Sequence, residues 1–184
     1  MNFGGFSVDS PHSAPLVRPV GALILNFGSV ELLSMMWIAA LTSESVLVDR
    51  ALVMLFSKRV ELIRDLMAAR ETPRKLEKAA SKAWADAERL AMVRNDVAHS
   101  PIIFGWHGPE EQRPPDFLGT FNVKKLRGKK PEQLPLLDKG FLDAKNDEIV
   151  RLAQRLGDLL KEVTEAAKAA KAAASHRPPA TDAG

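Results

Sequence analysis

The sequence predicts an all-α protein, an up-and-down four-helix bundle with a short two-stranded β insertion before the last helix. Three observations predict it. Apolar residues recur at the helical period in four long stretches, short polar corners separate these stretches, and apolar residues alternate after Pro101. We expect a flexible N-terminal arm at 1–15, one helical-bundle domain at 16–172 containing the ribbon at about 101–126, and a disordered tail at 173–184.

The first helix is expected to begin near Arg18 or Pro19, because proline is tolerated in a first turn, and to end at Leu41. Its apolar residues surround it, which is typical of a helix at the centre of a domain or beneath a second subunit. Glu31 lies on an apolar stripe one turn after Phe27. Such a carboxylate needs a cationic partner or a raised pKa, unless it lies in water at the rim of the bundle.

The stretch 20–41 is apolar enough to raise the question of a membrane span. Asn26, Ser29, Glu31 and Ser34 lie in its middle, and a carboxylate at mid-bilayer is costly. We therefore expect a buried core helix and no membrane partner. The absence of cysteine fits a reducing, cytoplasmic compartment and excludes disulfides, thiolate metal sites and cysteine nucleophiles.

The remaining elements follow in order. Thr42 and Ser43 precede a second helix expected at 44–69, and Thr72 is the expected cap of a third helix at 73–98. Two runs of alternating apolar residues then predict the ribbon, namely Ile102, Phe104 and Trp106, then Phe117, Phe121 and Val123. The fourth helix is expected from Asp138 or Asp143 to about Ala172.

The exit of the ribbon holds the densest basic cluster of the chain, five cations in seven residues: Lys124, Lys125, Arg127, Lys129 and Lys130. Beside aromatic residues, such a cluster suits the phosphate backbone of a nucleic acid. An ordinary solvated turn would have the same composition. The cluster therefore makes RNA a candidate partner without requiring one.

A polar quartet lies at the end of the third helix: Arg94, Asn95, Asp96 and His99. Arg94 and His99 are five residues apart, about 140° round a helix, so they converge only if the helix ends between them. Pro101 favours such an end because proline disfavours helical geometry at the residue before it. His99 then lies at a helix C-terminus, where the dipole favours its protonated form.

This quartet suits a phosphodiester. Arg94 could balance charge on the phosphorus, His99 could move protons at the ribose oxygens, and Asn95 could hold a phosphate or a base. Asp96 could orient a side chain or end the helix. The structural alternative pairs Arg94 with Glu31 and makes the other residues helix-end caps. His99 and His107 are the one close histidine pair and lack a carboxylate at ligand spacing, so we expect no metal and no cofactor.

The pattern Arg94-Asn95-x-x-x-His99 resembles the Arg-x4-His signature of HEPN domains, and Arg-Asn-x-x-Ala-His-Ser also resembles mannitol-repressor-like small bacterial helical proteins. The resemblance implies a homodimer of helical bundles acting as a metal-independent endoribonuclease, with Arg94 and His99 as the catalytic pair. Attack by the 2′-hydroxyl would give a cyclic phosphate. Glu31 would pair with Arg94.

The resemblance also implies a role as a toxin or defence effector with an antitoxin or regulatory partner. Many such domains keep the motif and act only as nucleic-acid-binding or regulatory modules. The chain could also be a dimeric helical interaction protein. The basic ribbon and the alanine-rich tail are not part of the core of the HEPN family.

Overall fold

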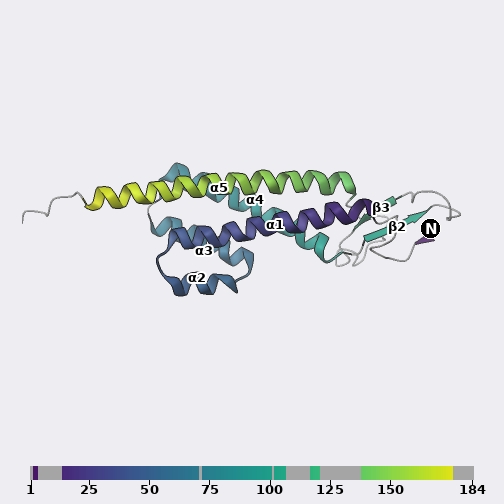
Figure 1. Ribbon diagram of the computed structural model, residues 1–184, viewed down its shortest axis with the longest axis horizontal. Helices are drawn as coiled ribbons and strands as arrows, with labels where there is room; N and C mark the ends of the chain where they lie inside the picture. Colours follow the sequence, from purple (N-terminus) through teal and green to yellow (C-terminus); the bar gives the residue numbers. More distant parts are fainter. Residues whose placement is uncertain are drawn as a thin grey trace, which may run out of the picture. The chain divides into compact units, whose positions relative to one another are not determined.

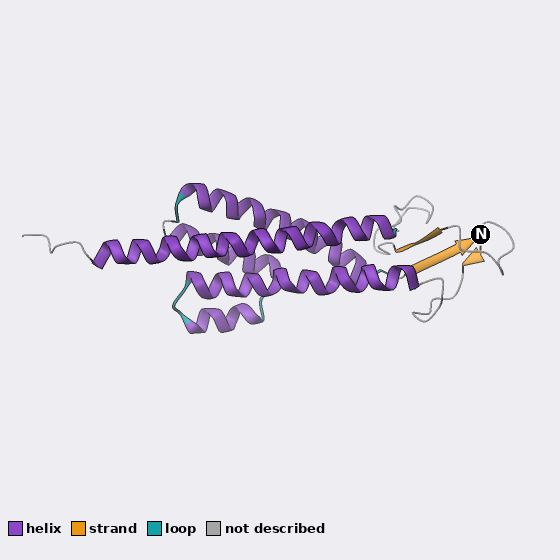
Figure 2. Cartoon of the chain, turned by 45° about the horizontal axis from the view of Figure 1, so that its top comes forward, coloured by secondary structure: helices purple, strands orange, loops and turns teal. Residues whose placement is uncertain are grey.

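The described part of the protein consists mainly of helices (Figures 1 and 2). The structure is a computed structural model that describes residues 2–3, 14–70, 72–100, 102–106, 117–120 and 138–175. In chain order its elements are β1 (Asn2–Phe3), α1 (Ala14–Leu41), α2 (Ser45–Leu52), α3 (Phe56–Ala69), α4 (Arg74–Ala98), β2 (Ile102–Trp106), β3 (Phe117–Thr120) and α5 (Lys139–Ser175).

These elements form two compact units. Unit 1 comprises Met1–Val30 and Asp86–Leu152, and unit 2 comprises Glu31–Ala85 and Ala153–Gly184. Three helices, α1, α4 and α5, contribute residues to both units. The end of α4, where the polar quartet lies, belongs to unit 1.

Unit 1 has its core on three helices. The first half of α1, the second half of α4 and the start of α5 supply its buried apolar side chains, which are Leu16, Leu23, Phe27, Val30, Ala87, Leu90, Val97, Leu142, Ile149 and Leu152. Two polar contacts also join α5 to the other helices. Asn26 Nδ2 donates to Asn146 Oδ1 at 2.7 Å, and Arg89 forms an ion pair with Glu148. Apolar burial and these two contacts together hold the three helices of unit 1.

Two tryptophans are central to unit 2. Trp37 on α1 and Trp84 on α4 pack edge to face, with ring centroids 5.8 Å apart and an interplanar angle of 86°. Trp37 Nε1 donates to the Leu156 carbonyl on α5 at 3.1 Å, and the Phe56 ring of α3 lies 6.3 Å from Trp84. Aromatic pairs of this geometry contribute about 0.5–1.5 kcal/mol beyond their buried area. The surrounding core comprises Ile38, Leu41, Ala51, Val60, Ile63, Met67, Leu76, Ala80, Ala83, Leu156, Leu159 and Val163.

The prediction of four helices is wrong, because α2 and α3 replace one continuous helix at 44–69. Val53 and Met54 donate their N–H groups three residues back, to Arg50 and Ala51, and the chain then turns. Ala51 and Val60 are both buried. In one continuous helix they would be nine residues apart, about two and a half turns, and would point in opposite directions. The corner lets both side chains enter the core, although no glycine or proline marks it.

The prediction of a two-stranded ribbon at about 101–126 is also wrong. The strands there are not a self-contained pair, because β2 pairs antiparallel with β1 as well as with β3. In the register, Asn2 lies opposite Trp106, and Ile102 lies opposite Thr120. Part of the segment expected to be an arm therefore forms a strand. A strand of two residues is too short to show the alternation on which the prediction depended.

The cap expected before the second helix is not the one observed, because the N-cap of α2 is Glu44 and its side chain makes no capping bond. Thr42 Oγ1 accepts the Glu44 N–H at 3.1 Å at the corner after α1. Asp138 Oδ1 accepts the Phe141 N–H at 2.8 Å, so Asp138 caps α5 and the earlier of its two predicted starts is correct. The helix α5 continues to Ser175, beyond its predicted end near 172.

The helix α1 is longer than predicted. It begins at Ala14, so Pro19 lies inside it, near the amino-terminal end, where a missing N–H removes only one early hydrogen bond. Among the described residues, α1 is the one helix long and apolar enough to cross a membrane, with a mean hydropathy of 1.6 in its most apolar window. One third of that window is buried inside the protein. The core helix of a soluble protein meets the same criterion, so the cytoplasmic location stays a prediction.

Candidate functional site

The polar quartet occupies the carboxyl-terminal end of α4, which stops at Ala98. His99 is the first residue past the helix, and its N–H still donates to the Asn95 carbonyl at 3.1 Å. Ser100 then closes the turn, because its N–H donates to the Val97 carbonyl at 3.3 Å and its hydroxyl donates to the Asp96 carbonyl. The last turn is thus tightened by a bond over three residues, as is common where helices end.

Arg94 is held against α1. Its guanidinium carbon lies 5.1 Å from the centroid of the Phe27 ring, and Phe27 is fully buried. A guanidinium within about 6 Å of an aromatic face is attracted to the negative potential of the ring. This contact therefore holds the half-buried Arg94 side chain against α1 within unit 1.

The other three residues of the quartet have different surroundings. Asn95 and His99 are exposed, whereas Asp96 is half-buried. Val97 between them is buried and anchors this turn in the core of unit 1. The structure brings Arg94 to Phe27 but does not place His99 in that contact, since His99 faces solvent past the helix end. Arg94 and His99 thus occupy different environments.

Glu31 belongs to unit 2, whereas Arg94 belongs to unit 1, so their pairing stays a prediction. Glu31 is half-buried on α1. Its backbone carbonyl accepts the Ser34 hydroxyl at 2.6 Å and Arg59 Nη1 of α3 at 3.5 Å. The Arg59 guanidinium also lies 5.8 Å from the Phe56 ring centroid. Arg59 is thus half-buried against the same turn of α1 as Glu31.

The sequence did not predict a charged network near the quartet in unit 1. Lys145 Nζ donates to Glu148 Oε2 at 2.6 Å, and Arg89 binds the other oxygen of that carboxylate. Arg89 Nη2 also lies 3.6 Å from Asp86 Oδ1, at ion-pair distance. The hydrogen bond from Arg89, followed by that from Lys145, lowers the pKa of Glu148, and the same bond is the main cause that raises the pKa of Arg89. This network links α4 to α5.

The Asn26–Asn146 pair was missed as well, although its signal was visible. Asn26 interrupts the apolar stretch of the first helix, and an amide that is partly removed from water needs a hydrogen-bonding partner. The next residue, Phe27, contacts Arg94. Two consecutive residues of α1 thus contact two different helices, Asn26 contacting α5 and Phe27 contacting α4. The partner could not be identified from the sequence, because Asn146 is 120 positions away.

The described residues do not test two further predictions, the basic cluster and the absence of a metal. The basic cluster of Lys124, Lys125, Arg127, Lys129 and Lys130 lies outside the described residues. Among the residues that the structure does describe, no three His, Asp or Glu side chains group as metal ligands would.

No protein-family model, curated protein or solved structure matches this chain. The HEPN resemblance therefore depends on the motif and on its position at a helix end.

Proposed function

We propose that the carboxyl-terminal end of α4 is an RNA-cleaving site in which Arg94 and His99 act without a metal ion. The observation that carries this proposal is the end of α4 at Ala98. It leaves His99 exposed just past the helix, while Arg94 is held on Phe27 slightly more than one turn earlier. The resemblance of this motif to the HEPN signature supports the same function.

In the proposed reaction the ribose 2′-oxygen bonds to the adjacent phosphorus and the bond from phosphorus to the 5′-oxygen breaks. The imidazole of His99 moves protons, because one must leave the 2′-hydroxyl and another must reach the departing 5′-oxygen. Arg94 donates to the non-bridging oxygens, where negative charge builds up. The products are a 2′,3′-cyclic phosphate and a 5′-hydroxyl.

The active form in this proposal is a homodimer. In one protomer Arg94 rests on α1 while His99 faces solvent, which supports a cleft that combines Arg94 of one copy with His99 of the other. Unit 1 also exposes large apolar side chains on the helices that hold Phe27 and Arg94, namely Ile24 and Leu25 on α1 and Met92 on α4. Covering such side chains is favourable, at about 25 cal/mol for each Å² removed from water.

Cleavage of a labelled single-stranded RNA in excess EDTA tests the catalytic role. We expect His99→Ala to lower the rate about 10²–10⁴-fold, the usual contribution of a general acid–base group. Arg94→Lys keeps a cation on Phe27 but removes the guanidinium fork, so it should also be slow. Arg151→Ala, an exposed arginine of α5 in the same unit, is the matched control and should cleave normally. Undiminished cleavage by the Arg94→Ala/His99→Ala double variant would rule out this site.

Mixing two inactive variants tests the composite dimer. An Arg94→Ala chain keeps His99, and a His99→Ala chain keeps Arg94. If catalysis uses one residue from each protomer, the mixture recovers activity that neither variant has alone. If the pair acts within one protomer, the mixture stays inactive and the composite cleft is wrong.

A second candidate is a non-catalytic nucleic-acid-binding module, favoured by the contact between Arg94 and Phe27, which gives Arg94 a structural role. Such a module would bind RNA without cutting it, and its affinity would fall steeply with salt. Neutralising the five cations at 124–130 would weaken that binding. A chain with no affinity for RNA would instead be an interaction protein.

A further inference from the structure

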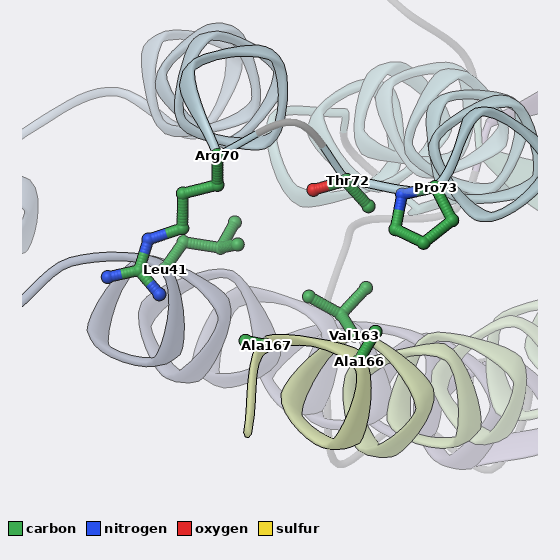
Figure 3. Close-up of a pocket in the computed structure, with 7 residues that line it drawn as sticks. All are labelled: Leu41, Arg70, Thr72, Pro73, Val163, Ala166 and Ala167. Carbon is green, nitrogen blue, oxygen red and sulfur yellow. The ribbon is translucent and has the colours of Figure 1, made fainter. Parts of the chain in front are cut away.

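Unit 2 contains a pocket of about 240 Å³ (Figure 3). Leu41 from the end of α1 lines it, together with Arg70, Thr72 and Pro73 from the corner between α3 and α4, and Val163, Ala166 and Ala167 from α5. None of these residues belongs to the quartet at the end of α4. The pocket is therefore independent of the proposed RNA site.

One side of the pocket is apolar. Leu41 and Val163 are buried core residues, and Ala166 and Ala167 add only methyl groups, which leaves the space beside them open. Figure 3 shows these α5 residues across the pocket from Thr72 and Pro73. An apolar body placed there would be removed from water, which is favourable.

Arg70 and Thr72 supply the positive charge and the hydrogen-bond donors of the lining, and the Arg70 guanidinium lies beside Leu41 (Figure 3). Arg70 is exposed and donates Nη1 to the Ala40 carbonyl at 3.4 Å, which uses one of the five N–H groups of its guanidinium. Thr72, with its hydroxyl, lies across the pocket from Val163 and Ala166, as Figure 3 shows. The helix α4 begins directly after Pro73, whose carbonyl accepts the Leu76 N–H at 2.8 Å. The positive end of the dipole of a 25-residue helix thus lies beside the pocket.

The lining of the pocket suits a ligand that carries a single negative charge. Its described lining residues include one cation and no carboxylate. An Arg fork binds a carboxylate through two parallel hydrogen bonds, and a threonine hydroxyl can donate a third. A phosphate dianion would leave a second charge without a cation in the lining. The volume is also below the roughly 300–1,000 Å³ of pockets for drug-sized ligands.

We propose that this pocket binds a small monocarboxylate with a compact apolar body. Arg70 holds the carboxylate, Thr72 donates to it, and the body packs on Leu41, Pro73 and Val163.

Titration of the full chain with benzoate, followed by the amide NMR signals of Thr72 and Ala167, tests this proposal. Benzoate should shift both signals and bind at least about tenfold more tightly than neutral benzamide, because a charge-assisted bond is lost with the amide. Acetate, which lacks the apolar body, and inorganic phosphate should both bind more weakly than benzoate. Equal binding of acetate or tighter binding of phosphate would overturn the assignment.

Matched variants separate the two sides of the pocket. Arg70→Met should weaken benzoate binding about tenfold, whereas Arg74→Met, an exposed arginine outside the lining, should leave it unchanged. Ala166→Leu should fill the space and abolish binding, whereas Ala169→Leu on the exposed side of α5 should not. Undiminished binding by Ala166→Leu would contradict the proposal even if Arg70→Met failed to fold.

Discussion

Trp37 and Trp84 carry the same indole group but differ in what their N–H groups meet. Trp37 Nε1 donates to the Leu156 carbonyl, whereas Trp84 Nε1 is buried with no hydrogen-bond partner among the described residues. A buried donor left without an acceptor costs free energy, and a satisfied one contributes about 1 kcal/mol. Urea unfolding should therefore show Trp37→Phe to be more destabilising than Trp84→Phe by roughly 1 kcal/mol. Equal losses would show that the two indole N–H groups do not differ in this way.

Glu148 should make stability depend on pH in acid solution. Its folded pKa is lowered from the ordinary value of 4.5, mainly by Arg89 and then by Lys145. A lowered folded pKa adds stability above the ordinary value, and this stability is lost as the pH falls through the folded pKa. Glu148→Gln should therefore be less stable than the wild type at neutral pH and approach it below pH 4.5. Thermal melts across this range should show no such trend for Glu162→Gln, an exposed control.

At the residue scale, the sequence predicted which polar residues lie at a helix end but not what they contact. Pro101 and the local pattern were sufficient to place His99 just past α4, because proline acts on the preceding residue. Phe27 is 67 positions from Arg94, so their contact depends on the packing of α1 against α4 in unit 1. No local pattern encodes such a pair.

The corner between α2 and α3 gives a prediction for two leucines. Leu52 ends α2 and Leu55 precedes α3, and they are 67% and 75% exposed. Leu55 is the N-cap of α3 and makes no side-chain capping bond, and the first turn of α3 has no acidic residue. Leu55→Asp should thus stabilise the protein by about 0.5–1 kcal/mol through capping and the helix dipole.

Leu52→Asp is the matched control, because it places the same carboxylate at the carboxyl-terminal end of α2, where the dipole opposes it. Urea unfolding should show Leu52→Asp to be neutral or slightly destabilising. Had the two segments formed one helix with both leucines inward, each change would cost several kcal/mol. A large loss at Leu55 would therefore contradict the corner.

At the element scale, the positions of the helices followed from periodicity and caps, whereas the corner and the sheet did not. Apolar residues fill 51–56 without a break, so local preference alone continues the helix through the corner. The burial of both Ala51 and Val60 decides against it. Pairing of β1 with β2 joins segments about 100 residues apart, which periodicity cannot detect.

At the scale of the whole molecule, the two units carry separate proposals. Unit 1 holds the quartet at the end of α4 that we propose to cleave RNA, and unit 2 holds the pocket at the start of the same helix that we propose to bind a carboxylate. Loss of RNA cleavage in His99→Ala should therefore leave benzoate binding intact, and filling the pocket with Ala166→Leu tests only the second site. Failure of either proposal leaves the other standing.

The chemical ends of the RNA products test the central claim most directly. Mass spectrometry of RNA incubated with the wild type in excess EDTA should show new fragments with 2′,3′-cyclic phosphate and 5′-hydroxyl ends, and His99→Ala should give none. Intact RNA with the wild-type protein, fragments with other end groups, or the same fragments from His99→Ala would each contradict a catalytic site at the end of α4.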